Sequence, residues 1–261
     1  MGWTERQKSM LQEMGVRLWA PVVAEPAMPT AHAAAEAPKS SAPAVGAVVC
    51  PPVPAAAPSD ERGAAIAAMS WPALREAVAA CTACGLCQSR RQTVFGVGNP
   101  NAHWMIVGEA PGEQEDLKGE PFVGAAGHLL DNMLRALKLT REEAPPERQV
   151  YIANTLKCRP PRNRNPEAEE LARCEPFLVR QIELIRPRLI LAMGRFAVHS
   201  LLRSSEPIGK LRGRVHRYQG VPLVVTYHPA YLLRNLADKS RAWDDLCLAA
   251  QTVEAASATR V

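Results

Sequence analysis

Four short runs of apolar residues, separated by helical patterns, organise the chain from residue 103 onward. They read HWMIVGEA (103–110), VYIANTLKC (150–158), RLILAMG (188–194) and PLVVTYHP (222–229). Each run has the length of a β-strand, and continuous apolar character along a strand indicates that both of its faces are buried. The pattern therefore predicts an α/β fold of three layers, α/β/α, with a central four-stranded parallel sheet.

The segments between and after these runs have the 3.6-residue periodicity of amphipathic helices. Three of them cover residues 126–139, 166–187 and 194–204, and a fourth closes the chain at 238–256. The second begins with acidic residues and ends with basic ones, which suits the dipole of a helix. Residues 213–226 (GRVHRYQGVPLVVT) are typical of a hairpin that leads into the last strand.

The first 70 residues are different in character. Residues 1–19 are predicted to contain a short amphipathic helix, for which a protein partner is a hypothesis. Residues 20–69 are rich in Ala and Pro and are predicted to be a disordered linker. The folded domain is then expected at residues 70–261, beginning with a helix that Ser70 caps and that leads into Cys81.

Charge and composition narrow the class of protein only slightly. The chain has a net charge of +5, which is compatible with a polyanionic partner but does not identify one. It contains no run of 18 apolar residues, and no apolar stretch of a secretory signal follows its charged beginning. We therefore expect a monomeric cytoplasmic protein without a membrane segment, in which clustered cysteines bind a metal or a cluster rather than form disulfides.

Three of the seven cysteines lie at three-residue spacing in CTACGLCQSR (81–90). They are Cys81, Cys84 and Cys87, while Cys158 and Cys174 follow in two later segments. A short loop and a distant segment that supply two thiolates each are a normal arrangement for an iron–sulfur cluster, and zinc is the competing interpretation. Spacing alone allows either neighbouring pair of the first three, and Cys174 could also be a small core residue.

Polar, glycine-rich and basic residues gather where each apolar run ends. In open α/β sheets, ligands bind at the carboxyl ends of the strands, so these residues are candidates for a binding site. The first group, GEAPGEQED (108–116), lacks the GxGxxG pattern and the lysine of a phosphate-binding loop, which argues against a nucleotide cofactor. Its carboxylates, together with Phe122, suit a pocket that holds a planar ring.

Six motifs in this order resemble the family 4 uracil-DNA glycosylases, which carry a [4Fe–4S] cluster. The motifs are CTAC, VFGVGNP, MIVGEAPGEQED, PFVGAAG, YIANTLKCRPP and HPAYLLRN, and the resemblance covers about residues 74–250. It implies a uracil-DNA glycosylase-like fold and hydrolysis of the N-glycosidic bond of uracil in single- or double-stranded DNA, which leaves an abasic site. It also implies a structural [4Fe–4S] cluster on Cys81, Cys84, Cys158 and Cys174, with Cys87 as a surplus thiol.

The same resemblance assigns roles in the pocket. Phe122 would stack on the extruded uracil, Asn154 would read its Watson–Crick edge, and His228 would stabilise charge on its O2 side. Gly108, Glu109 and Ala110 would contact the base. The wider superfamily often has an aspartate where Ala110 stands, so Glu109 or a neighbouring carboxylate is the candidate for activating water. A water positioned by the main chain is the alternative.

Contacts to DNA are expected on either side of this pocket. Leu232, or its neighbour Leu233, could fill the space that the extruded base leaves, and the alternative is that these leucines pack on the preceding helix. Basic residues could bind phosphates, and they are Arg159, Arg162, Arg164 and Arg234.

Two other functions compete: a uracil-DNA binding protein without turnover and an iron–sulfur electron carrier. Relatives that bind uracil-DNA without turnover carry a histidine in a basic insertion, and this sequence has no histidine in the segment after the second predicted strand. An electron carrier would not need Asn154 and His228.

Overall fold

The computed structural model describes residues 59–258. The predicted helix at 1–19, with its hypothetical partner, and residues 20–58 of the predicted linker lie outside this range. Residues 59–69 were also expected to belong to the linker, but they contain helix α2 (Ser59–Ala67). This part of the prediction needs correction. The segment between Pro58 and Pro72 is proline-free and alanine-rich, which favours a helix, and α2 is fixed by packing, with Ile66 buried.

A six-stranded sheet in the order β1-β3-β2-β4-β6-β5 forms the centre of the fold. The four inner strands are parallel, as the apolar runs predict: β3 (Tyr151–Asn154), β2 (Trp104–Gly108), β4 (Leu189–Met193) and β6 (Val221–Thr226). The antiparallel edge strands are β1 (Val97–Gly98) and β5 (Val215–Tyr218). The hairpin of β5 and β6 was predicted. The two-residue strand β1 was not, because it is too short to show a pattern.

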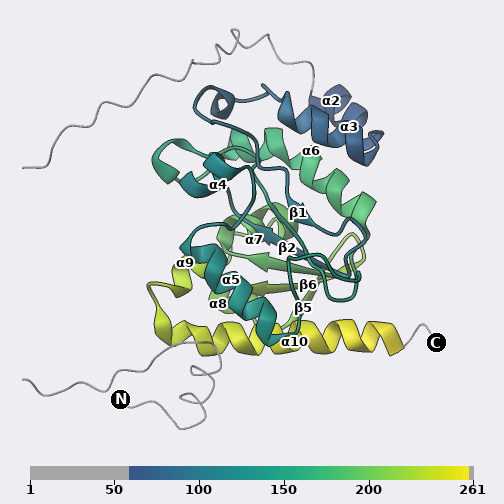
Figure 1. Ribbon diagram of the computed structural model, residues 1–261, viewed down its shortest axis with the longest axis vertical. Helices are drawn as coiled ribbons and strands as arrows, with labels where there is room; N and C mark the ends of the chain where they lie inside the picture. Colours follow the sequence, from purple (N-terminus) through teal and green to yellow (C-terminus); the bar gives the residue numbers. More distant parts are fainter. Residues whose placement is uncertain (1–58, 259–261) are drawn as a thin grey trace, which may run out of the picture. The chain divides into compact units, whose positions relative to one another are not determined.

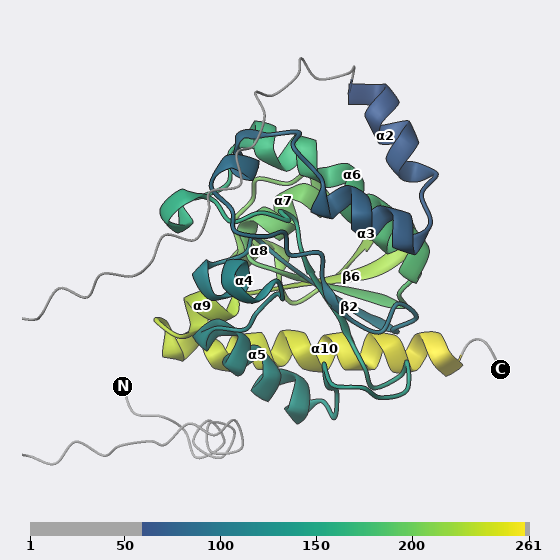
Figure 2. The ribbon, with the colours of Figure 1, turned by 45° about the horizontal axis from the view of Figure 1, so that its top comes forward.

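Helices cover both faces of this sheet, which confirms the three-layer prediction (Figures 1 and 2). One face carries α5 (Ala125–Ala136) and α10 (Lys239–Ala258), and the other carries α6 (Ala168–Ile185) and α7 (Arg195–Leu202). The face of α5 that contacts the sheet consists of the apolar positions of its periodic pattern, namely Leu129, Leu130, Met133 and Leu134. Within residues 59–258, every helix is too short or too polar to span a lipid bilayer.

A smaller apolar cluster joins the first helices of the described chain to α6. It contains residues from α2, from α3 (Trp71–Ala79) and from the cysteine segment around the short helix η1 (Gly85–Gln88). Ser70 is the N-cap of α3, as predicted, although its hydroxyl makes no capping hydrogen bond. This cluster places the first cysteines beside the loop that follows β3 and beside Phe177 of α6.

Short helices complete the fold near the carboxyl ends of the strands. They are α4 (Glu113–Lys118), η2 (Pro161–Asn163), α8 (Ile208–Leu211), α9 (Pro229–Leu232) and η3 (Leu236–Asp238). The register of the sheet aligns the strand ends: Gly108 pairs with Asn154, and Met193 pairs with Thr226. Residues that follow β2, β3, β4 and β6 therefore meet at one edge of the sheet.

Candidate active site

The ends of β2 and β3 are joined by hydrogen bonds beyond the sheet itself. The N–H of Thr155 donates to the carbonyl of Gly108 at 3.0 Å, and the N–H of Leu156 donates to the carbonyl of Glu109 at 3.1 Å. The Thr155 hydroxyl also donates to the Glu109 carbonyl at 2.5 Å. The two segments thus run side by side past the sheet, so that residues after β2 and after β3 face the same space.

Gly108 allows an amide and an aromatic ring to meet at this edge. A Cβ atom at position 108 would lie 2.4 Å from Asn154 Oδ1 and 2.6 Å from Phe122 Cζ, so no larger residue fits without a shift. Asn154 is 2% exposed, and its Oδ1 has no hydrogen-bond partner among the described residues. A buried acceptor without a donor costs about 1–3 kcal/mol, so it is a strong candidate for contact with a ligand N–H.

Phe122 has an unusual backbone that directs its ring toward this amide. Its φ is +55°, in the left-handed region that a bulky residue seldom adopts. The ring stacks on the imidazole of His228, with 5.3 Å between centroids and 27° between planes. A left-handed conformation at a bulky residue persists only where neighbouring contacts hold it.

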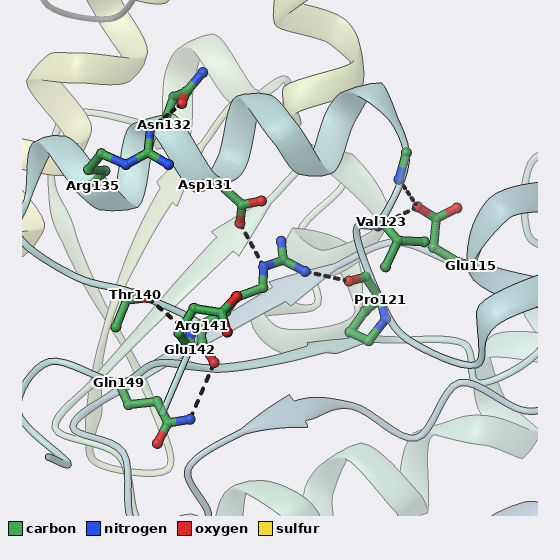
Figure 3. A network of polar contacts seen from close by, with 11 residues as sticks. Glu115, Pro121, Val123, Asp131, Asn132, Arg135, Thr140, Arg141, Glu142 and Gln149 are labelled. Carbon is green, nitrogen blue, oxygen red and sulfur yellow. Dashed lines mark hydrogen bonds and ion pairs between the residues drawn. The ribbon is translucent and has the colours of Figure 1, made fainter. Parts of the chain in front are cut away.

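Two sets of polar contacts fix the loop on either side of Phe122 (Figure 3). On one side, Glu115 Oε1 accepts hydrogen bonds from the N–H groups of Val123 (2.9 Å) and Gly124 (3.1 Å). On the other side, Arg141 donates to the carbonyl of Pro121 at 3.1 Å and forms an ion pair with Asp131 at 2.6 Å. The loop is thereby fixed before and after Phe122.

His228 lies at the N-cap of α9, directly after the last strand. Its Nδ1 accepts the N–H of Ala230 at 3.1 Å, so the proton of a neutral imidazole sits on Nε2. Burial lowers the pKa of His228 to about 4, and the nearby charge of Arg234 acts in the same direction while Glu115 opposes it. At neutral pH the side chain is therefore an uncharged Nε2–H donor.

Glu109 and Ala110 follow Gly108 and are half-buried. Burial raises the pKa of the Glu109 carboxyl, while Arg195 at the start of α7 lowers it. A carboxylate whose basicity is raised by burial is suited to accept a proton from water. The predicted base-contacting residues thus lie at the ends of β2 and β3 and on the loops after β2 and β6, with Phe122 just before α5.

The four predicted ligand cysteines line one pocket in the smaller apolar cluster. Cys81, Cys84, Cys158 and Cys174 contribute to its wall, together with Phe177. Cys87, which is buried in η1, does not. Within residues 59–258, no three His, Cys, Asp or Glu side chains form a group that could hold a single metal ion.

Several N–H groups point at these sulfurs. Arg90 donates to Cys158 Sγ at 3.0 Å, Arg62 donates to Cys81 Sγ at 3.7 Å, and the N–H of Lys157 donates to Cys174 Sγ at 3.3 Å. Hydrogen bonds from N–H donors to sulfur are a usual feature of protein sites for iron–sulfur clusters.

Burial makes these thiols costly to ionise in the absence of a cation. Burial is the main cause that raises the pKa of Cys158 to about 11 and that of Cys174 to about 12. The neighbouring cysteines act in the same direction, while the charges of Arg90 and Lys157 oppose the rise. Four thiolates this close together need positive charge among them, which a metal cluster supplies. The all-sulfur donor set and the N–H groups around it fit such a group.

The predicted DNA contacts divide into supported and unsupported positions. Leu232 needs correction as the wedge residue: it is 0% exposed and belongs to the core beneath α5, whereas Leu233 is 42% exposed. Leu232 is the last residue of α9 and Leu233 is its C-cap with helical backbone angles, so the two neighbouring side chains point in different directions.

The four predicted arginines differ in how accessible they are to a phosphate. Arg162 and Arg234 are exposed. Arg164 is held by the buried Glu170 at 2.5 Å, and the half-buried Arg159 donates to Asn163 at 2.8 Å. Since Arg164 already has a carboxylate partner, Arg162 and Arg234 are the better candidates.

The residues that position the site were not singled out from the sequence. Glu115 was one of several carboxylates in its motif, and no pattern marks Arg141 or the buried Lys157. Their roles come from contacts between segments that are far apart along the chain, which no local pattern records.

The sequence is similar to those of known proteins. A model of the uracil DNA glycosylase superfamily matches residues 95–247. The type-4 uracil-DNA glycosylase of Archaeoglobus fulgidus is 44% identical over 164 residues, which cover 60% of this chain and 79% of the relative. That of Thermotoga maritima is 44% identical over 168 residues (64% and 84%), and that of Pyrobaculum aerophilum is 40% identical over 185 residues (67% and 90%).

Proposed function

The chain belongs to the type-4 family of the uracil DNA glycosylase superfamily, and from this premise we propose that it removes uracil from DNA by hydrolysis of the N-glycosidic bond. The observation that carries the proposal is the convergence of Gly108, Phe122, Asn154 and His228 at one edge of the sheet. DNA stacks its bases inside the duplex, so the uracil must be extruded before it can enter this pocket.

Asn154 accounts for the choice of base. Its unpartnered Oδ1 can accept the N3–H of uracil, while its amide N–H can donate to O4. Cytosine presents an acceptor at N3 and a donor at N4, which is the opposite pattern. The ring of Phe122 would lie against the face of the base and exclude water from these hydrogen bonds.

His228 would stabilise the departing base. When the bond between C1′ and N1 breaks, its electron pair stays with the uracil, and negative charge spreads to O2. The uncharged Nε2–H of His228 can donate to that oxygen in a buried site, where such a donor is most effective. A water molecule then bonds to C1′ and loses a proton, for which Glu109 is the candidate acceptor; a water held by the main chain is the alternative.

We also propose that Cys81, Cys84, Cys158 and Cys174 hold a [4Fe–4S] cluster. The four-thiol lining and the N–H donors to sulfur support this, as does the resemblance of the cysteine motifs. Cys81 and Cys84 after α3, Cys158 after β3 and Cys174 in α6 would hold the group, which would cross-link these three segments, a structural role. The cytoplasmic location and the monomeric state stay predictions.

Iron content distinguishes the ligand cysteines from the surplus one. Replacing Cys158 by alanine is expected to abolish stoichiometric iron and to lower Tm by about 10 °C or more, since several kcal/mol of binding energy are lost. Cys87→Ala is expected to keep both iron and the absorbance near 400 nm. The measurements are iron per chain and thermal unfolding. Full iron in Cys158→Ala, or zinc alone in the unaltered protein, would contradict the assignment.

Leu232, the last residue of α9, and its neighbour Leu233 are expected to give opposite results. Leu233→Ala should reduce activity on duplex DNA about tenfold and leave single-stranded DNA almost unaffected, because only a duplex leaves a gap to fill. Leu232→Ala should instead destabilise the fold by about 2–5 kcal/mol through a core cavity. Cleavage rates on both substrates and urea unfolding check this pair. An equal loss on both substrates for Leu233→Ala would exclude the wedge.

An oligonucleotide with a single uracil tests the function directly. The protein is incubated with it, and hot alkali then breaks the strand only where the base has been removed. Strand scission supports the glycosylase. Tight binding without scission would favour a protein that captures uracil-DNA without turnover. If neither binding nor scission is seen, the electron carrier is the remaining interpretation. A strand with cytosine at the same position is the matched control.

A further inference from the structure

Lys157 is a buried lysine between two features of the site. One is the pocket lined by the four predicted ligand cysteines, here called the thiol pocket, and the other is the side-chain amide of Asn154. Lys157 is 1% exposed, and charged side chains are almost never buried to this degree without partners. Its Nζ donates to the main-chain carbonyl of Asn154 at 2.8 Å and to Oε1 of Gln181 at 2.6 Å. The ammonium therefore holds the last residue of β3 against helix α6.

Gln181 anchors this ammonium in one orientation. It is 0% exposed, and its Nε2 donates to the carbonyl of Phe95 at 2.9 Å and to the Tyr151 hydroxyl at 3.1 Å. Turning the amide over would place N–H groups against the ammonium and an oxygen against the Phe95 carbonyl. The network is thus fully determined, and satisfied buried networks of this kind make a structure rigid.

The other end of the residue belongs to the thiol pocket. The main-chain N–H of Lys157 donates to Cys174 Sγ at 3.3 Å, and Cys158 is the next residue. One residue therefore contacts the pocket through its backbone and Asn154 through its side chain.

We infer that Lys157 is a positioning residue that sets the place of Asn154 for uracil recognition and connects it to the thiol pocket. This inference rests on the proposed function. Without the ammonium, the Asn154 carbonyl and Gln181 Oε1 would be buried acceptors with no donor. The end of β3 would then shift to find other partners, and a displacement of about 1 Å at a recognition group is enough to weaken binding strongly.

A double-mutant cycle tests whether Lys157 acts through Asn154. Lys157→Met removes the ammonium at nearly constant length, and it is combined with Asn154→Ala. Binding is measured on an oligonucleotide with 2′-fluoro-deoxyuridine, whose fluorine slows breakage of the glycosidic bond, and iron per chain is measured alongside. We expect Lys157→Met alone to weaken binding about tenfold, to weaken it less than twofold when Asn154 is already alanine, and to keep full iron.

Lys239→Met is the matched control, since Lys239 is also a buried lysine but lies in α10, and it is expected to bind as the unaltered protein does. If Lys157→Met does not fold, Gln181→Met takes its place: it keeps the ammonium but removes its anchor, and the same loss of effect in the Asn154→Ala background is expected.

Three results would overturn the inference: unaltered binding by Lys157→Met, an equal loss of binding in both backgrounds, or a loss of iron that parallels the loss of binding. Failure of the proposed function is seen separately, in the unaltered protein, as equal binding of uracil-containing and uracil-free DNA.

Discussion

Replacing Asn154 by alanine is expected to lower kcat/KM for uracil-containing DNA by about a thousandfold. The substitution removes two hydrogen bonds to the base in a buried site, at about 2 kcal/mol each, and about 4 kcal/mol corresponds to that factor. The unpartnered Oδ1 of the free protein would disappear with the amide, so the fold itself should not lose stability from this change. Single-turnover rates and thermal unfolding of the same sample measure the two effects.

The matched control is Asn132→Ala, which removes an asparagine from α5 whose side-chain oxygen accepts a hydrogen bond from Arg135 (Figure 3). It should retain activity. Asn154→Ala is also expected to bind uracil-free DNA as the unaltered protein does, because phosphate contacts lie elsewhere. A loss of affinity for uracil-free DNA as large as the loss of activity would mean that Asn154 supports the DNA-binding surface rather than the base.

Replacing His228 by alanine is expected to lower kcat by a factor of about 10² to 10³, with a smaller change in KM. This is the usual effect of removing one donor that faces a developing anion. The donor is already neutral at pH 7, because burial lowers the pKa of His228 to about 4. Rates under saturating substrate, measured from pH 5 to pH 8, should therefore show no step that belongs to His228.

A second readout follows from the same pKa. Between about pH 6.5 and pH 4, His228 is protonated in the unfolded chain but stays neutral in the folded protein. The free energy of unfolding should therefore fall as the pH is lowered through that range. His228→Gln should reduce this slope. An unchanged slope together with an unchanged kcat would remove His228 from the site.

The parallel strands and the covering helices were predictable because each leaves a periodic pattern along the chain. The apolar runs at β2, β3 and β4 are buried on both faces, as are the last four residues of β6, and the leucines and the methionine of α5 face the sheet. Strand order and the alignment of Gly108 with Asn154 are properties of the assembled sheet, but the rule that ligands bind at strand ends was enough to find the right loops.

The remaining features depend on contacts between distant segments. Residues 59–69 were assigned to the linker because helix α2 has no apolar stripe that a sequence pattern would show. Its stability comes from packing against α6. The choice between Leu232 and Leu233 required the direction of a four-residue helix. The burial of Lys157 could not be foreseen, since lysine is ordinarily exposed and its partner Gln181 lies 24 residues away.

The tight backbone between Asn154 and Cys158 also bears on how such a protein can change over evolutionary time. Thr155 and Leu156 are bonded to the residues after β2, and Lys157 is bonded to a sulfur, so each intervening residue has a fixed partner. An insertion or deletion of a single residue here would change the spacing between Asn154, which is proposed to read the base, and the cysteines that are proposed to hold an inorganic group. Lineages can lengthen surface loops freely, but we expect this three-residue interval to keep its length.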